Sequence, residues 1–140
     1  MTVRIVNLRK DRFDLYIGRR RNGAYNKWAN PYPINARRTR KQAIIEYERN
    51  LLAQIESGEV TREELADLHR QGTVVGCFCA PQPCHGEVIA LYAAAASECG
   101  RTGLFEDTWP MFLAERSRIS SVFSFPGKLE YRIGGRVFNE

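Results

Sequence analysis

Three cysteines and a histidine are crowded into one short stretch, TVVGCFCAPQPCHGEVI, at residues 73–89. Cys77 and Cys79 end an apolar run, and Cys84 and His85 follow a proline-rich turn. Because side chains alternate along a strand, we expect the first two thiols on the same face. Such crowding, in a chain that starts without a signal peptide, is typical of metal or thiol chemistry rather than of a disulfide framework.

The helix expected to begin at Cys84 and His85 would place both side chains near the positive end of its dipole. Unpaired backbone N–H groups and that dipole favour a thiolate at Cys84 and a neutral imidazole at His85. Open α/β sheets usually bind ligands where a strand gives way to a helix. We therefore predict that Cys79, Cys84 and His85 are the reactive residues of a site at this edge.

Three interpretations of this cluster stay open. The first is a metal-free site in which Cys84 or His85 acts as nucleophile, acid or base. The second is a metal site whose ligand types suit zinc, with the ligands Cys77, Cys79, Cys84 and His85. Its CxC pair and contiguous Cys-His pair depart from the usual zinc-knuckle spacing. The third is structural, with the cysteines packed as small hydrophobic side chains.

A second group of residues has the chemistry to hold an anionic ligand. Gly18, at the end of an apolar run, would let the backbone approach a ligand, and Arg19 can form paired hydrogen bonds with phosphate. In the following loop, Trp28 and Tyr32 could stack on a base and Asn30 could bond its polar edge. Positive charge near the start of the next helix comes from Arg37, Arg38 and Arg40. The alternative is a plain turn with solvated arginines.

Charge is distributed unevenly along the chain, which has a net charge of +5. Residues 1–50 hold 13 Lys or Arg against 4 Asp or Glu, whereas residues 51–140 hold 8 against 12. A basic first half suggests a phosphate-bearing partner, a nucleotide or a nucleic acid, because clustered arginines attract phosphate. A solvated basic face with no ligand is the alternative.

Periodicity and turn residues predict the elements that position these groups. Short strands are expected at residues 3–8 and 13–17, and a buried central strand at 73–79. Helices are expected at 39–55, after a Thr61–Glu64 capping box, at 84–97 and after residue 107 or 108. Residues 129–140 predict a hairpin around Gly134-Gly135.

The alternation of strands and helices predicts an α/β fold: a small, mostly parallel sheet flanked by helices, with a C-terminal helix and β-hairpin added. At 140 residues the chain is expected to form a single domain. If strand 13–17 pairs in parallel with strand 73–79, Arg19 and Cys84 should share one pocket. No apolar run approaches the roughly 20 residues that span a bilayer, so we expect a cytoplasmic protein without a membrane partner.

Three motifs together resemble a known family. They are Y-I-G-R at residues 16–19, W-x-N-P at 28–31 and G-C-F-C-x-P-x-P-C-H-G at 76–86. The set is similar to the domain-of-unknown-function family 4326 of bacteriophages and bacteria, with Phe78 in place of the family's tryptophan. The likeness covers about residues 12–95 and implies a phage or prophage setting, hence the host cytoplasm. It leaves residues 100–140 as an addition that packs on the family-like core.

Taken together, these features favour a nucleotide- or nucleic-acid-directed protein, with an enzyme as the leading hypothesis. The arginines would hold phosphate while Cys84 and His85 act on or orient the base or sugar. One alternative is a non-catalytic phage protein that sequesters a nucleotide signal or blocks a host factor. Another is a zinc-stabilised nucleic-acid-binding module.

Overall fold

The structure is a computed structural model that describes residues 2–19, 25–79, 82, 84–99, 108–122, 130–133 and 136–139. Its nine named elements follow one another in this order: β1 (Arg4–Asn7), β2 (Leu15–Tyr16), α1 (Arg40–Ser57), α2 (Arg62–Arg70), β3 (Val74–Cys77), α3 (His85–Cys99), α4 (Trp109–Val122), β4 (Glu130–Ile133) and β5 (Arg136–Asn139). The predicted α/β class is confirmed. The strands are shorter than predicted, and α3 begins one residue later, at His85.

The first three strands form a parallel sheet in the order β1-β3-β2. Ile5 of β1 and Leu15 of β2 both lie opposite Val75 of the central strand. Val75 and Cys77 are fully or almost fully buried, as expected for the middle strand of a parallel sheet. The predicted parallel pairing is therefore confirmed, and the carboxyl ends of β2 and β3 open onto the same edge.

Helices α1 and α2 both begin with a capping box. The Thr39 hydroxyl accepts the Gln42 N–H, and Thr61 does the same for Glu64. In each box the side chain of the later residue returns a bond to the backbone N–H of the threonine. Gly58 ends α1 in the left-handed conformation, with φ of 85°, which glycine adopts without steric cost.

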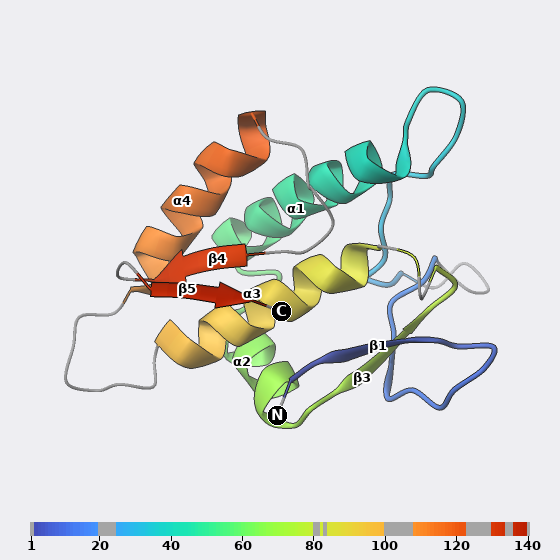
Figure 1. Ribbon diagram of the computed structural model, residues 1–140, viewed down its shortest axis with the longest axis horizontal. Coiled ribbons are helices and arrows are strands. Elements are labelled where there is room, and N and C mark those ends of the chain that lie inside the picture. Colours follow the sequence, from blue (N-terminus) through green and yellow to red (C-terminus); the bar gives the residue numbers. More distant parts are fainter. Residues whose placement is uncertain are drawn as a thin grey trace.

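Helix α3 is buried on almost every side, which its alanine-rich sequence permits. It packs against the sheet, α1 and α2, and Figure 1 shows it crossing the middle of the molecule. Gly86 makes the close approach to the sheet possible: a Cβ there would lie 3.0 Å from Ile17 and 3.2 Å from Ile5. The first turn of α3 is therefore pressed against the strand ends.

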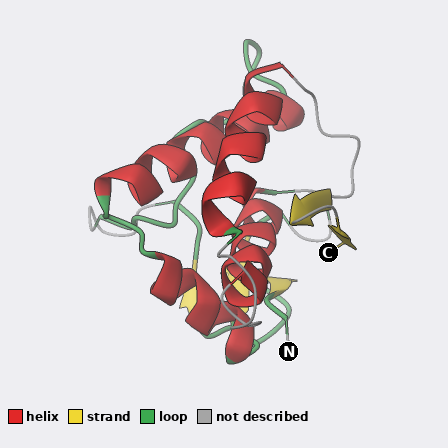
Figure 2. Cartoon of the chain, turned by 90° about the vertical axis from the view of Figure 1, so that its left-hand side faces the viewer, coloured by secondary structure: helices red, strands yellow, loops and turns green. Residues whose placement is uncertain are grey.

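Helix α4 and the antiparallel hairpin β4–β5 complete the fold. The hairpin lies apart from the parallel sheet in Figures 1 and 2. The predicted hairpin is present, and its Gly134-Gly135 turn lies outside the described residues. Within the described part of the chain, no helix combines the length and apolar character needed to cross a membrane.

Candidate functional site

A cavity of about 430 Å³ lies at the carboxyl edge of the parallel sheet. Its walls come from the ends of β2 and β3, the start of α3, the loop before α1 and the first turns of α1. Most of the residues predicted from the sequence line it: Gly18, Arg19, Asn30, Cys77, Cys79, Cys84 and His85. The structure thus places the thiols, the imidazole and the arginine around one space, as the parallel pairing of β2 and β3 required.

The three thiols of the cavity are linked to one another. Cys77 Sγ lies 3.4 Å from Cys84 Sγ, and both residues are buried. The Gly86 backbone N–H also donates to Cys84 Sγ, at 3.3 Å. Either thiol could donate to the other by geometry; we assign Cys77 S–H as the donor, because the Gly86 N–H favours negative charge on Cys84. Hydrogen bonding from Cys77 lowers the pKa of Cys84, and the Gly86 N–H adds to this against the opposing effect of burial.

The surroundings of Cys79 favour its protonated thiol, in contrast to those of Cys84. Its hydrogen bond to Cys77, together with burial, raises its pKa well above the ordinary value, and the nearby Arg40 only partly opposes this. Cys79 therefore stays protonated at neutral pH. A chain of S–H groups thus runs from Cys79 through Cys77 to Cys84, and the negative charge is most stable on Cys84.

His85 occupies the first position of α3 but bonds away from the thiols. Its Nε2 lies 2.7 Å from the Ile17 carbonyl oxygen. The centres of the His85 and Tyr47 rings lie 4.7 Å apart, and the two rings meet edge to face. Burial lowers the pKa of His85 to about 4, although the carbonyls of Ile17 and Trp28 favour the charged form. Burial therefore favours the neutral imidazole, because its effect outweighs that of those hydrogen bonds. His85 ties α3 to the end of β2.

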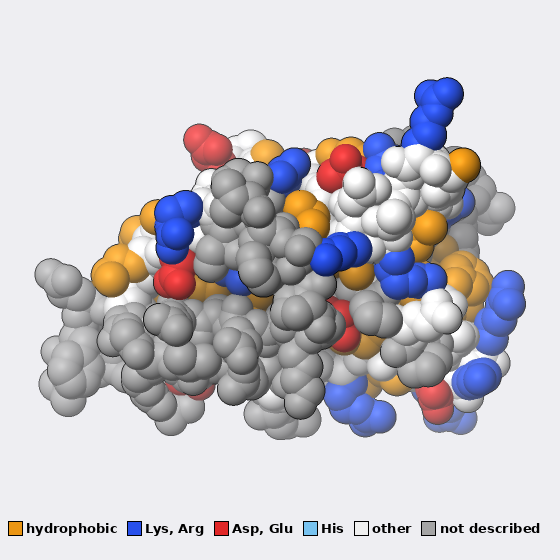
Figure 3. Space-filling view, turned by 45° about the horizontal axis from the view of Figure 1, so that its top comes forward, with side chains coloured by type: hydrophobic (Ala, Val, Ile, Leu, Met, Phe, Trp, Pro, Cys, Tyr) orange, Lys and Arg blue, Asp and Glu red, His pale blue; other side chains and the backbone are white. Residues whose placement is uncertain are grey.

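The positive charge of the cavity comes from Arg9, Arg19 and Arg40. Arg19 is exposed, and its backbone oxygen accepts from the Tyr16 hydroxyl at 2.6 Å. The ring of Tyr16 covers Gly18, where a Cβ would lie 2.5 Å from the Tyr16 oxygen. The absence of a side chain at Gly18 therefore leaves room for the Tyr16 ring to pack over it. Figure 3 shows Lys and Arg side chains spread over the right-hand side of the molecule, the side where β1 and β3 lie in Figure 1.

The remaining predicted ligand-binding residues have structural partners. Asn30 lines the cavity, but its Nδ2 donates to the Ala43 carbonyl and its Oδ1 accepts the Tyr32 N–H. Trp28 is buried in the core and is not part of the cavity lining. Arg38 also lies outside that lining, where it pairs with Glu46 at 2.5 Å. The structure therefore does not bring Trp28 and Arg38 to the site.

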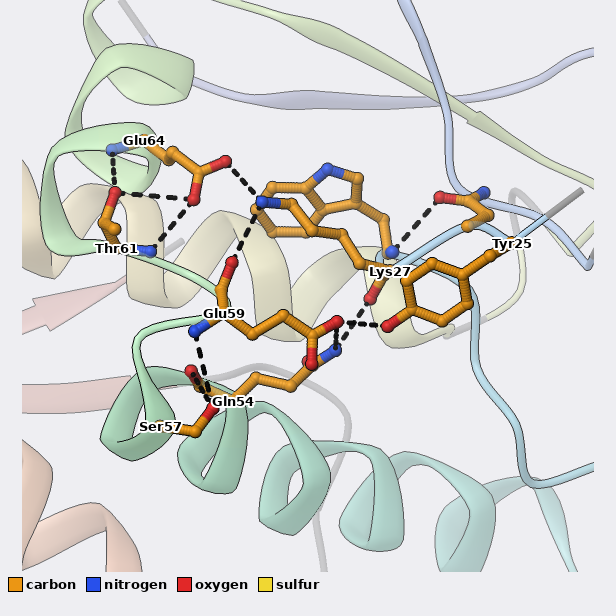
Figure 4. A network of polar contacts seen from close by, with 9 residues as sticks. Tyr25, Lys27, Gln54, Ser57, Glu59, Thr61 and Glu64 are labelled. Atoms are coloured by element: carbon orange, nitrogen blue, oxygen red, sulfur yellow. Dashed lines mark hydrogen bonds and ion pairs between the residues drawn. The ribbon is translucent and has the colours of Figure 1, made fainter.

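A second cavity of about 560 Å³ adjoins the first and shares Arg19 and Asn30 with it. Part of its wall is the polar network of Figure 4, which joins the loop at residues 25–28 to the junction between α1 and α2. Lys27 bonds the Glu64 carboxylate and the Glu59 backbone oxygen, and Gln54 donates to the Lys27 carbonyl. This network anchors the loop at residues 25–28 to the junction between α1 and α2.

The geometry of the cluster does not suit the predicted zinc site. Among the described residues, no group of three or more Cys, His, Asp or Glu side chains is arranged to hold a metal ion. The Nε2 atom of His85 faces a carbonyl oxygen instead of the thiols. Cys84 and His85 are adjacent, and their side chains diverge at the start of α3.

Two further lining residues with ligand-binding chemistry, Arg9 and Phe78, were not predicted from the sequence, whereas Tyr32 and Arg40, which were, also line the cavity. The Arg9 guanidinium lies 5.0 Å from the centre of the half-exposed Phe78 ring, a cation–π contact. Arg9 follows β1, and its place at the carboxyl edge of a parallel strand was the signal that could have identified it. Tyr32 and Arg40 lie in the loop before α1 and at its start, and only the packing of that loop decides what they contact.

Comparison with known proteins gives the cavity a family context. A model of the family described as "Domain of unknown function (DUF4326)" matches residues 4–95. The chain belongs to this family. The matched segment runs from β1 into α3 and contains all the described residues that line the first cavity. The resemblance seen in the three sequence motifs is confirmed.

A curated relative comes from Enterobacteria phage T4. It is described as "Uncharacterized 12.4 kDa protein in nrdA-td intergenic region" and is 38% identical to the chain over 87 residues. That stretch is 62% of this chain and 73% of the phage protein. No solved structure was found to match the chain. Similarity to a phage protein is thus established for the larger part of the sequence.

Proposed function

We propose that the protein binds a phosphate-bearing nucleotide, free or within a nucleic acid, in the cavity at the carboxyl edge of the sheet. One observation carries the proposal: Arg9, Arg19 and Arg40 surround a largely apolar space that ends at a buried thiol cluster. Guanidinium groups suit phosphate oxygens, and an apolar space of this size suits a flat base. The carboxyl edge of a parallel sheet is also the usual ligand site of α/β folds.

Within that complex, Cys84 is the reacting group. Its thiolate is favoured by the Cys77 S–H and the Gly86 N–H, and thiolates are the nucleophilic form of cysteine. It lies at the floor of the cavity, where a base or sugar would meet it once the phosphate is held at the rim. His85 has a positioning role, because its Nε2 is engaged by the Ile17 carbonyl.

Binding is tested by calorimetric titration with nucleoside monophosphates and with a short single-stranded oligodeoxynucleotide. Arg19→Ala should weaken the binding of whichever probe binds by about tenfold or more, because a charge-assisted phosphate contact is lost. Arg37→Ala is the matched control, because Arg37 is exposed and lines neither cavity. Equal affinities in the two variants, or the absence of binding for every probe, would remove the proposal.

The salt dependence of binding affinity distinguishes a free nucleotide from an oligonucleotide. The second cavity continues from the first at Arg19, so a chain of nucleotides could extend across both. The affinity for an oligonucleotide should then fall as the salt concentration rises. The slope of log affinity against log salt concentration grows with the number of phosphates contacted. The affinity for a free nucleotide, which would contact only the arginines of the first cavity, should depend weakly on the salt concentration.

A second candidate is a non-catalytic protein that sequesters a nucleotide. The observation that favours it is the hydrogen bond between His85 Nε2 and the Ile17 carbonyl. Because of this bond, that nitrogen does not act as an acid or base toward a ligand. Native mass spectrometry after incubation with a cell extract separates the two candidates. A sequestering protein retains a small molecule of unaltered mass, whereas an enzyme releases a changed product that Cys84→Ser no longer forms.

A further inference from the structure

The Cys77 and Cys84 sulfurs lie 3.4 Å apart at the floor of the cavity. Cys77 is the last residue of β3 and Cys84 directly precedes α3, so neither is held in the middle of a regular element. Both are almost fully buried, at 1% and 3% exposure, yet both line the cavity, so the cavity is their route to small molecules.

We propose that Cys77 and Cys84 form a redox-active dithiol that reacts with small anionic disulfides entering the cavity. This activity is additional to nucleotide binding. It requires only the two sulfurs, access through the cavity and a partner disulfide.

The distance between the sulfurs suits this reaction. A disulfide bond is roughly 2 Å long, so the sulfurs must approach by a little more than 1 Å. That movement is smaller than a side-chain rotamer change and lies within reach of a strand end and a residue that precedes a helix. Cys99 lies at the far end of α3 and is not among the described residues that line this cavity.

The order of attack follows from the hydrogen bonds. The Cys84 sulfur accepts from Gly86 N–H and from Cys77, so Cys84 is the attacking thiolate. It forms a bond to one sulfur of the small disulfide, whose S–S bond breaks and releases one thiolate. Cys77 then gives its proton to the released thiolate or to water. Its sulfur attacks Cys84 in the mixed disulfide and expels the second thiolate. Two protein thiols are oxidised, and one disulfide is reduced to two thiols.

The arginines of the cavity indicate the charge of the partner. Arg9 and Arg19 are exposed and line the same space as the thiols, and Arg40 lies beside Cys79. A disulfide that carries carboxylates, such as oxidised glutathione, is attracted there, whereas a cationic disulfide such as cystamine is repelled. Cationic surroundings also speed the attack of a thiolate on an anionic partner.

The test uses a Cys79→Ser/Cys99→Ser variant, in which Cys77 and Cys84 are the remaining thiols. After exposure to oxidised glutathione and alkylation, intact mass should show both thiols closed as an internal disulfide, reopened by a dithiol reductant. Adding Cys84→Ser should leave Cys77 reduced. Closure should be about tenfold faster with oxidised glutathione than with cystamine at low salt, and Arg19→Ala should shrink that difference.

The proposal is overturned if both thiols remain open to alkylation in the folded protein, or if a mixed disulfide forms on Cys84 and never resolves. Equal rates with the two probes would overturn the assigned anionic partner. Should the double-serine variant fail to fold, non-reducing peptide mapping of the wild-type chain answers the same question. Nucleotide titration of the reduced protein is a separate measurement, so failure of this inference and failure of the proposed function are told apart.

Discussion

At the scale of single residues, the neighbours of a side chain decide its chemistry more than its own type does. Cys84 and Cys79 line one cavity, but the pKa of the first is lowered and that of the second is raised. The difference follows from their hydrogen bonds, because Cys84 is an acceptor and Cys79 a donor in the same chain of thiols.

Removing the donor at Cys77 should therefore slow the alkylation of Cys84. In Cys77→Ala, the pKa of Cys84 should rise, because its first stabilising hydrogen bond is gone. The rate of its reaction with iodoacetamide at neutral pH should fall by about threefold or more, as followed by peptide mass spectrometry. Cys99→Ala is the control, and its effect on Cys84 should be negligible. A rate in Cys77→Ala equal to that of the control would contradict the assignment.

His85 should make stability depend on pH on the acid side of neutrality. Its folded pKa of about 4 lies below the ordinary value of 6.5, so the unfolded chain takes up the proton first. The stabilisation is present above about pH 6.5 and is lost as the pH falls toward about 4. Between about pH 7 and about pH 5 this one group should cost about 2 kcal/mol of unfolding free energy.

His85→Gln separates this effect from the titration of carboxylates. Glutamine keeps a side-chain N–H for the Ile17 carbonyl but does not titrate. Urea unfolding at both pH values should show a smaller pH-dependent loss in the variant than in the wild type. The same loss in both proteins would show that His85 does not carry the dependence.

At the scale of elements, α1, α3 and α4 are joined by a buried polar group. Arg116 of α4 donates to Glu48 of α1 at 2.7 and 2.8 Å, and the Tyr92 hydroxyl of α3 donates to the same carboxylate at 2.5 Å. Glu48 and Arg116 are 0% and 4% exposed. Beside them the Tyr92 and Phe112 rings meet edge to face at 5.2 Å. The position of α4 is thus specified by polar contacts as well as by apolar packing.

Arg116→Ala should destabilise the protein strongly, because it leaves the Glu48 carboxylate buried without its cation. Loss of one partner of a buried ion pair costs about 3–5 kcal/mol. Lys41→Ala also removes one positive charge, but from an exposed site of α1, and should change stability by less than about 0.5 kcal/mol. Chemical denaturation measures both.

The double change Glu48→Gln/Arg116→Met identifies the cause. Because it removes both charges and keeps most of the volume, it should recover part of the stability lost in Arg116→Ala. If the double variant is as unstable as the single one, lost packing rather than an unpaired charge explains the effect.

At the scale of the whole molecule, the family match ends at residue 95, before α4. The described residues that line the cavity all lie within the matched segment, whereas Arg116, the cation that balances Glu48, lies beyond it. Where the structure describes it, the later segment therefore contributes to stability and lies outside the cavity lining.

Truncation after residue 99 should accordingly lower stability while leaving the cavity residues in the chain. The loss should be about 3 kcal/mol or more, because Glu48 loses its ion pair and Tyr92 its aromatic neighbour. Glu48→Gln in the truncated chain should recover part of it. Thermal and urea unfolding of the full and truncated chains measure the difference. An unchanged midpoint, or no benefit from Glu48→Gln, would contradict this role for α4.

Local signals in the sequence were sufficient for most of the elements. The capping box at Thr61 and Glu64, the glycine after Ser57 and the apolar run before Cys77 each act within a few residues, so they can be recognised without a structure. Strand ends were overestimated, because pairing depends on a neighbouring strand that local composition does not describe.

The sequence by itself determined the α/β class, the family and the meeting of Arg19 with the thiols, because parallel strands bring their carboxyl ends to one edge. Tertiary structure decided what each side chain does there. It directs His85 to Ile17, covers Gly18 with Tyr16, buries Trp28, pairs Arg38 with Glu46 and adds Arg9 and Arg40 to the cavity. Those contacts join residues from separate elements, and spacing along the chain carries no information about which of the available partners a side chain will reach.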